Sequence, residues 1–251
     1  MKRIRILGLC IIAMLVVGAV AAAVASAAQP EYAACVKVKG GKFEKGCAKE
    51  GGKGGYALEP VTEPESLTGK AGVTVFDVFV PGMGVVGTTE CQKAKIKGEI
   101  VSPTEEEVVV TYEKCSSSGK ACTSVAAGTK RGDIVTSALI GKPVFIEGGT
   151  GVGDTLSPKG GGNVAEYNCE GEEVATTGSI TAEYTEMIGE AAKKTGVRFT
   201  VNADGEPAIP TEGSRDTLLS TIKGVGTLPS GETSWWSELM AKILRILASD
   251  E

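Results

Sequence analysis

The chain has 251 residues, with 26 Lys and Arg, 31 Asp and Glu, 35 Gly and no His. Without His, Ser-His-Asp and Cys-His catalysis and His-based metal sites are excluded. An apolar fraction of 42% is enough for a core, so the chain is not a disordered acidic protein. The length suits one domain of moderate size, or one domain with a small appendage.

The first residues have the pattern of an export signal. Three basic residues among the first five precede an unbroken apolar run from Ile6 to Val24, and small residues close the segment at 25–28. This pattern predicts a secretory signal peptide over residues 1–27, with cleavage after Ala27 or Ala28. The alternative is an uncleaved anchor, since about 20 apolar residues can span a bilayer. We therefore expect a secreted, extracellular protein, or a membrane-anchored one if cleavage does not occur.

Removal of the signal peptide makes the chain more acidic. It leaves 23 basic and 31 acidic residues, a net charge of −8. An acidic protein repels the phosphates of nucleic acids, so we expect no nucleic-acid partner. The sequence does not identify any other partner.

Six cysteines remain after the signal segment. An even number in an exported chain predicts disulfide bonds rather than metal or redox chemistry, and six cysteines allow 15 pairings. The short spacing between Cys115 and Cys122 indicates a stapled turn, which leaves a long-range pair to join an early strand to a late one. The favoured pairing is Cys35–Cys47, Cys115–Cys122 and Cys91–Cys169.

Residues 28–62 differ in composition from the rest of the chain, being rich in Gly and Lys with little apolar mass. The segments 35–39 and 42–45 flank Gly40 and Gly41, a pattern typical of a short hairpin that its own disulfide would close. Such a module cannot bury a core unaided. Pro60 and Pro64 mark a linker to the next domain.

Residues 68–232 show the alternation of half-buried antiparallel strands. The alternating sets are Ala94, Ile96 and Ile100; Val108, Val110 and Tyr112; Ala165, Tyr167 and Cys169; Val174, Ile180, Ala182 and Tyr184; and Val197, Phe199 and Val201. With Gly and Pro turns between them, nine or ten strands are expected in an all-β antiparallel sandwich or open barrel. The run 73–80 is apolar on both faces and predicts a central strand.

Three local expectations accompany this domain. Continuing the alternation of 93–99 backwards puts Cys91 on the wet face, unless a bend or bulge lies near Gln92. Residues 187–194 could form a helical turn or two. Residues 148–162 are expected to be a flexible Gly-rich loop, because they lack the features of a phosphate-binding loop.

Residues 233–251 predict an amphipathic helix. Trp236, Leu239, Met240, Ile243 and Leu247 fall at helical spacing, and Ser234 is a suitable N-cap. The helix is too short to span a membrane. It is expected to pack on the sheet as a lid; the alternative is contact with a membrane interface or self-association with a second subunit.

The remaining motifs indicate no catalytic, cofactor-binding or metal-binding residue. The tripeptide 131–133 (Arg-Gly-Asp) arises easily by chance in a Gly-rich chain. The run 105–107 (Glu-Glu-Glu) lacks the alternating ligands of a calcium loop and is interpreted as a solvated strand entrance.

Several turn and Cys positions carry a resemblance. They are the C-x6-C spacing with Cys122-Thr-Ser, the T-x-x-L-x-G-K step at 136–142, Ala-Glu-Tyr-Asn-Cys at 165–169, V-x-x-x-G-S-I at 174–180, and the segment 35–47. Over residues 31–183 the chain resembles uncharacterised secreted β-rich proteins of high-GC Gram-positive soil bacteria. The resemblance implies compartment and fold, and no activity.

Two functional hypotheses follow. The first is an exported, non-enzymatic β protein with a structural, adhesive or ligand-binding role at the cell surface. The alternative is a secreted, glycosidase-like hydrolase that uses two carboxylates, for which two facing carboxyl groups about 5–10 Å apart would be needed.

Overall fold

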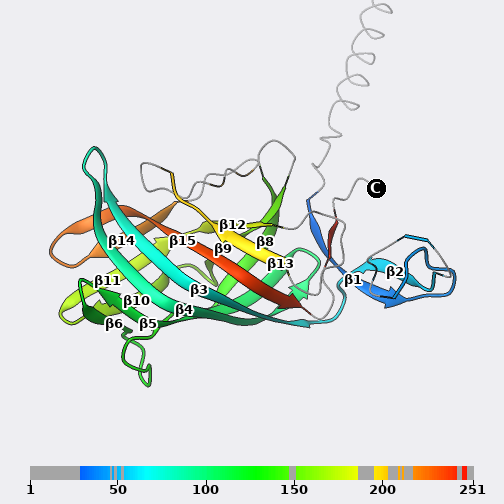
Figure 1. Ribbon diagram of the computed structural model, residues 1–251, viewed down its shortest axis with the longest axis horizontal. Coiled ribbons are helices and arrows are strands. Elements are labelled where there is room, and N and C mark those ends of the chain that lie inside the picture. The colour runs from blue at the N-terminus through cyan, green and yellow to red at the C-terminus, as the bar shows by residue number, and fades with distance from the viewer. Residues whose placement is uncertain are drawn as a thin grey trace, which may run out of the picture. The chain divides into compact units, whose positions relative to one another are not determined.

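The computed structural model describes residues 29–45, 47, 50–51, 54–146, 151–185, 195–202, 209, 211, 217–241 and 245–247. The protein is all-β, with 71% strand, antiparallel sheets, three disulfides and no helix in this described part. Residues 29–249 form one compact unit (Figure 1). Within the described ranges, no helix has the length and apolarity needed to cross a membrane. The expected signal peptide, residues 1–27, lies outside them.

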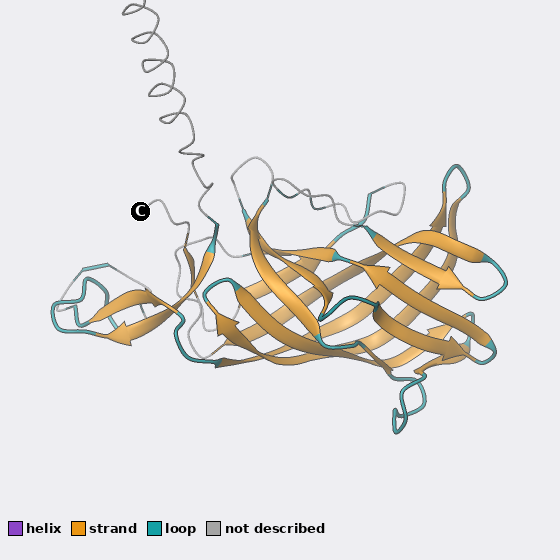
Figure 2. Cartoon of the chain, turned by 180° about the vertical axis from the view of Figure 1, so that it is seen from behind, coloured by secondary structure: helices purple, strands orange, loops and turns teal. Residues whose placement is uncertain are grey.

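A large antiparallel sheet contains most of the strands (Figure 2). Its members in chain order are β3 (Glu65–Val80), β4 (Gly84–Ser102), β5 (Glu105–Ser117), β6 (Lys120–Ser124), β7 (Ile134–Val135), β8 (Leu139–Phe145), β9 (Val152–Pro158), β10 (Asn163–Cys169), β11 (Glu172–Gly178), β12 (Ile180–Tyr184), β13 (Thr195–Phe199), β14 (Leu218–Ile222) and β15 (Gly226–Ala241). The neighbour order is β13-β12-β9-β8-β5-β4-β3-β15-β14-β11-β10-β6, and β7 pairs with β5.

The two ends of this order also find partners. β13 pairs with β15 as well as β12, and β6 pairs with β5 as well as β10. The long strands β3, β4, β5 and β15 are therefore shared by two groups of shorter strands. One group is β8, β9, β12 and β13, and the other is β6, β10, β11 and β14.

The alternation read from the sequence corresponds to burial. Every member of the first three alternating sets is buried, as are Val174, Ile180, Ala182, Val197 and Phe199. All of these side chains except Ile100 belong to one apolar cluster that draws on both groups of strands. The strand expected over 73–80 lies within β3, between β4 and β15, and is central.

The Gly-rich stretch 148–162 is not the loop expected from the sequence. Residues 152–158 form β9, which pairs with both β8 and β12. Gly153 is needed there because a Cβ at this position would lie 2.1 Å from the carbonyl oxygen of Ala182. Close strand approach, rather than flexibility, explains this glycine. The expected helical turn at 187–194 lies outside the described residues.

A smaller sheet has the order β16-β1-β2, with β1 (Glu31–Lys37), β2 (Tyr56–Pro60) and β16 (Arg245–Leu247). The hairpin expected between 35–39 and 42–45 is wrong: β1 pairs with β2, and Phe43 contributes only isolated bridges to Glu50 and Tyr56. A strand from the end of the chain, β16, completes this sheet. The disulfide Cys35–Cys47 expected for this segment is present.

The C-terminal helix expected over 233–251 is also wrong, because residues 226–241 form β15. This strand pairs with β3 along most of its length, from Ser230↔Val78 to Ala241↔Leu67. Two register irregularities, between Ser234 and Trp236 and between Trp236 and Glu238, interrupt the ladder. Each irregularity interrupts the two-residue period by which a strand is identified from its sequence. Ile243 of the expected helix lies outside the described residues, and Leu247 lies in β16 (Arg245–Leu247).

Two of the three expected disulfide pairings are wrong. Cys91 bonds Cys115 across the β4–β5 ladder, and Cys122 bonds Cys169 across the β6–β10 ladder, each pair directly opposite in register. The β5–β6 hairpin, in which Ser116 pairs with Ala121, brings the middle two cysteines to neighbouring strands. These four cysteines thus lie on four strands that are neighbours in space, in the order β4, β5, β6 and β10.

This arrangement explains the pairing. Had Cys115 bonded Cys122, the outer two would be three strand spacings apart, about 14 Å at about 4.8 Å per strand. Disulfides require Cα atoms within about 7 Å. Only the observed combination, with Cα–Cα distances of 3.9 and 4.0 Å, bonds all four.

Near Gln92, where the sequence predicted a bend or bulge, the alternation of buried and exposed residues is interrupted. Gln92 and Lys93 are consecutive exposed residues between buried Cys91 and buried Ala94, and the opposed residues of β3, 72 and 73, are also both exposed. At this point the inward-facing positions shift by one residue on both strands. The pairing register between the strands does not change. This interruption of the alternation is why Cys91 lies in the core.

Candidate binding site in the interior of the large sheet

The interior of the large sheet contains a cavity of about 70 Å³. It is lined by residues of β3, β4, β5 and β7–β15, and most of its wall is apolar, including Val110, Leu139, Leu156, Ile180 and Phe199. A small number of polar side chains face it, in two groups. An apolar cavity with a few convergent polar groups is the usual form of a small-molecule site.

The first polar group begins on β5. Glu106, Val108, Val110 and Tyr112 all lie on the buried face of this strand, and Glu106 is only 3% exposed. The interpretation of 105–107 as a solvated strand entrance is therefore wrong for Glu106. The burial of Glu106 could have been predicted from the sequence, because the two-residue alternation of Val108 and Val110 extends back to Glu106.

Asp154 of β9 is the second buried carboxyl of this group, also 3% exposed. The hydroxyl of Tyr32 donates to its Oδ1 at 2.5 Å, and the hydroxyl of Tyr184 donates to its Oδ2. Asp154 thus has a phenolic donor for each carboxylate oxygen. The hydroxyl of Tyr32 also lies close to Glu106 and lowers the pKa of that carboxyl.

Glu106 is less well satisfied than Asp154. Its Oε2 is buried and has no hydrogen-bond partner. Gly141 of β8 stands opposite Glu106 in the ladder, and a Cβ at this glycine would lie 2.5 Å from Cγ of Glu106. The glycine therefore provides the space into which the carboxyl group folds.

Burial controls the ionisation of this group. Desolvation raises the pKa of Asp154 to about 6, against the lowering effect of hydrogen bonds from Tyr184 and Tyr32. Desolvation, followed by the charge of Asp154, raises the pKa of Glu106 well above its usual value. The pKa values of both tyrosines are also raised, first by burial and then by the charge of Asp154. Burial is thus the main cause of the raised pKa of both carboxyls.

Tyr32 reaches this site from the smaller sheet. It lies on β1 and is 0% exposed. Its backbone N–H donates to the carbonyl of Pro103 at 2.6 Å, and its carbonyl accepts from the N–H of Val61 at 3.0 Å. With Val61, Ile100 and Val152 it forms a second apolar cluster. The N-terminal segment thus covers Asp154 with a fixed tyrosine.

The second polar group surrounds Glu232 of β15, which is 3% exposed. It accepts hydrogen bonds from the hydroxyl of Tyr112 at 3.0 Å and from Oγ of Ser234 at 2.6 Å. Burial, then the charge of Glu232, raises the pKa of Tyr112. The ring of Tyr112 meets that of Phe76 edge-on, with centroids 4.8 Å apart. Both oxygens of this carboxyl thus have a partner, unlike those of Glu106.

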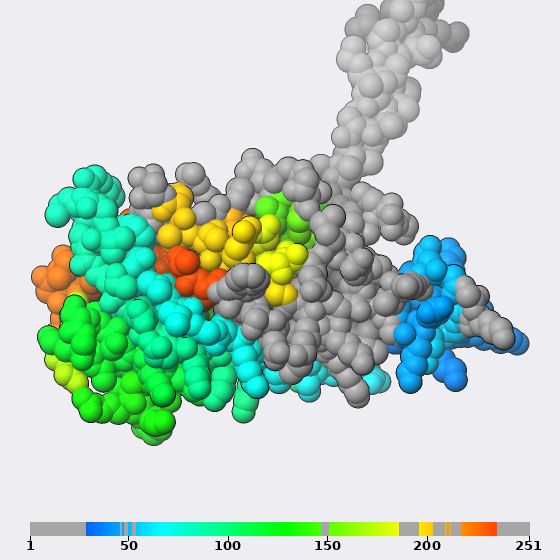
Figure 3. Space-filling view, in the orientation of Figure 1, coloured from blue at the N-terminus to red at the C-terminus, as the bar shows by residue number. Residues whose placement is uncertain are grey.

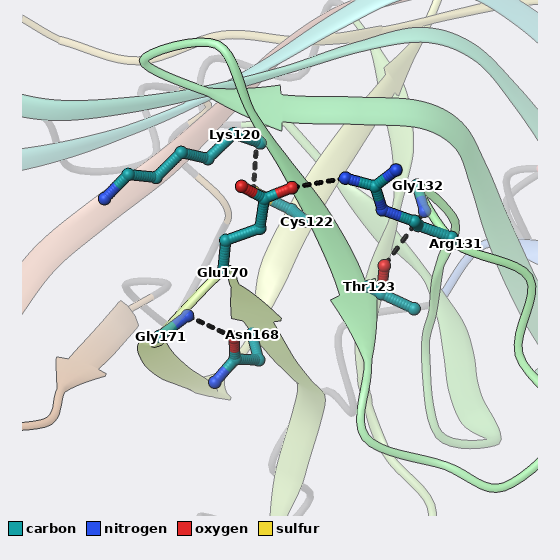
Figure 4. A network of polar contacts seen from close by, with 8 residues as sticks. All are labelled: Lys120, Cys122, Thr123, Arg131, Gly132, Asn168, Glu170 and Gly171. Atoms are coloured by element: carbon teal, nitrogen blue, oxygen red, sulfur yellow. Dashed lines mark hydrogen bonds and ion pairs between the residues drawn. The ribbon is translucent and has the colours of Figure 1, made fainter.

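The other residues considered from the sequence lie elsewhere. In the tripeptide 131–133, Arg131 forms an ion pair with Glu170, and the N–H of Gly132 donates to Oγ1 of Thr123 at 2.9 Å (Figure 4). These contacts tie the loop to the β6–β10 edge next to Cys122, a structural role. Across the described residues, no group of three or more metal-ligating side chains is present.

In Figure 3 the coloured part of β15 (orange to red) lies next to β3 (cyan), and β3 lies next to β4 (teal). Comparisons with family models, curated proteins and solved structures found no match.

Proposed function

We propose that this protein is an exported, non-enzymatic β-barrel that binds a small, mostly apolar molecule in its interior. The observation that carries the proposal is the apolar cavity with two convergent polar groups. The additional pairings β13–β15 and β5–β6 support closure of the sheet into a barrel. Small closed barrels hold side chains or one small ligand inside.

Export is supported by the cysteines. Three intramolecular disulfides are consistent with an oxidising extracellular environment. Together with the signal-like segment 1–27, they favour a role outside the cell or at its surface.

The cavity volume sets the size of the ligand. A volume of about 70 Å³ is that of about two molecules of liquid water, and about half of an engineered cavity that binds benzene. The part of the ligand that enters is therefore a short aliphatic group. At about 1.5 kcal/mol per heavy atom at best, four heavy atoms give affinities no tighter than tens of micromolar.

The test is an NMR titration of methyl-labelled protein with n-propanol. We expect shifts at the cavity residues Val110, Leu156 and Ile180, and none at exposed Val85. Ala182→Val adds two methyl groups to the cavity wall and should weaken binding. Ala127→Val makes the same change in an exposed loop and should not. Uniform small shifts at exposed and buried methyls alike would overturn the proposal.

One observation favours the alternative of a carboxylate-dependent hydrolase, namely the buried pair Glu106 and Asp154. The pair faces an apolar interior and is covered by Tyr32, whereas a glycosidase must admit a sugar and a water molecule between its carboxyls. Binding is therefore favoured over hydrolysis. Hydrolysis of nitrophenyl glycosides that disappears in Glu106→Gln would reverse this conclusion.

A further inference from the structure

We propose that Glu106 and Asp154 recognise the ammonium group of a short aliphatic amine, whose alkyl part occupies the apolar cavity. The inference rests on the proposed ligand-binding function and specifies the chemical class of the ligand.

The first argument is charge. Two buried carboxyls lie together, and none of the ion pairs in the described part of the chain includes either of them. Each of those ion pairs instead joins a Lys or Arg to a more exposed carboxylate. Buried carboxyls are normally paired with cations or held neutral. A bound ammonium would supply the missing positive charge.

The second argument is hydrogen bonding. Both oxygens of Asp154 already accept from tyrosine hydroxyls, whereas Oε2 of Glu106 is buried, lacks a partner and belongs to a residue that lines the cavity. Leaving a buried oxygen without a hydrogen bond is unfavourable, and more so when the oxygen is charged. An ammonium has three N–H donors and no acceptor, which suits a group made only of acceptors.

The third argument is the shape of the surroundings. The wall beside Glu106 continues along β5 as Val110 and across β8 and β9 as Leu139 and Leu156. Aliphatic side chains fit an alkyl chain and exclude a polar or anionic one. The cavity admits only a short ligand. The ammonium nitrogen of such a ligand can therefore reach Glu106 while its alkyl carbons contact these aliphatic side chains.

Binding should be linked to protons. The groups facing Glu106 are Asp154 and the hydroxyls of Tyr32 and Tyr184, and its raised pKa favours the protonated form in the empty protein. Ammonium binding requires the carboxylate, so it releases a proton to solvent. Affinity for an amine should therefore rise with pH, whereas affinity for a neutral alcohol of the same size should not.

The experiment compares n-propylammonium, n-propanol and propionate by methyl NMR titration. An alkylammonium is protonated at neutral pH, as the lysine side chain is. We expect n-propylammonium to bind at least ten-fold more tightly than n-propanol, and propionate not to bind. Glu106→Gln should reduce the amine to the affinity of the alcohol. Glu105→Gln, one residue away on the other face of β5, should leave the affinities for n-propylammonium and n-propanol unchanged.

The possible outcomes distinguish failure of the ammonium proposal from failure of the proposed ligand-binding function. Equal affinity for amine and alcohol in the natural protein, or an amine preference that survives in both Glu106→Gln and Asp154→Asn, would overturn the inference while interior binding stands. If neither ligand binds, the proposed function fails as well. Unchanged n-propanol binding by Glu106→Gln shows that this variant is folded and that its cavity is intact.

Discussion

Replacing Asp154 with Asn should remove a pH dependence from the stability of the protein. Burial raises the pKa of Asp154 from 3.8 to about 6 in the folded state. The folded protein therefore holds this proton more tightly than the unfolded chain does. The contribution of Asp154 to stability is fully present below pH 3.8, where both states are protonated, and is lost as pH rises towards and through 6.

The size of the effect follows from the same two values. The difference of about two pKa units, at about 1.4 kcal/mol per unit, corresponds to about 3 kcal/mol lost between roughly pH 3 and pH 7. Glu106 acts in the same direction, since its pKa is also raised. Glu113 acts in the opposite direction, because the ion pair with Lys95 lowers its pKa, but this contribution is common to wild type and variant.

The assay is urea unfolding at half-unit steps from pH 4 to pH 8, with the unfolding free energy extrapolated linearly to zero denaturant. The difference between wild type and Asp154→Asn, plotted against pH, isolates the contribution of this carboxyl. Asp133→Asn makes the same change in a surface loop and should give a curve parallel to wild type. A parallel curve for Asp154→Asn as well would refute the reasoning.

Three further outcomes are expected from urea unfolding at constant pH. Tyr32→Phe removes the 2.5 Å hydrogen bond to Asp154 and should lower the unfolding free energy by about 1.5–3 kcal/mol. Gly141→Ala places a Cβ against Glu106 and should cost about 1–3 kcal/mol, much of which should be recovered when Glu106 is also Ala. Replacing Cys122 and its partner together by Ala should cost about 4 kcal/mol, from a closed loop of 47 residues.

Each of these has a contrary result. An unchanged unfolding free energy for Tyr32→Phe would show that the hydroxyl is not bonded to the carboxyl in solution. Strictly additive losses at Gly141 and Glu106 would show that the two do not compete for space. Peptide mapping of unreduced protein that found Cys115 linked to Cys122 would contradict the pairing itself.

The sequence predicted the core of the sheet well, because burial there follows a two-residue period. Val108, Val110 and Tyr112 alternate cleanly, and the interruption near Gln92 could be inferred from a parity conflict. Prediction failed where the ladder is irregular. The two register irregularities near Trp236 interrupt the two-residue period, and pairing with β3 and β13 makes the segment a strand.

The candidate site was only partly visible from the sequence. Glu106 could have been placed inside by extending the alternation of β5, but a run of three glutamates usually indicates a wet surface. Tyr32 and Asp154 are 122 residues apart, and no local pattern indicates that a tyrosine of one sheet reaches a carboxyl of another. Such a contact depends on tertiary packing.

The cysteine ladder has a consequence for maturation. Among these four cysteines, Cys115 and Cys122 are separated by the fewest residues, so a bond between them would close the shortest loop. This non-native disulfide should therefore form first during oxidation. The thiols of Cys91 and Cys169 would then remain on β4 and β10, which are too far apart for a disulfide. Reaching the native protein then requires thiolate attack on that bond and exchange of partners, so the yield of correctly paired protein should depend on a disulfide isomerase or a mild thiol buffer.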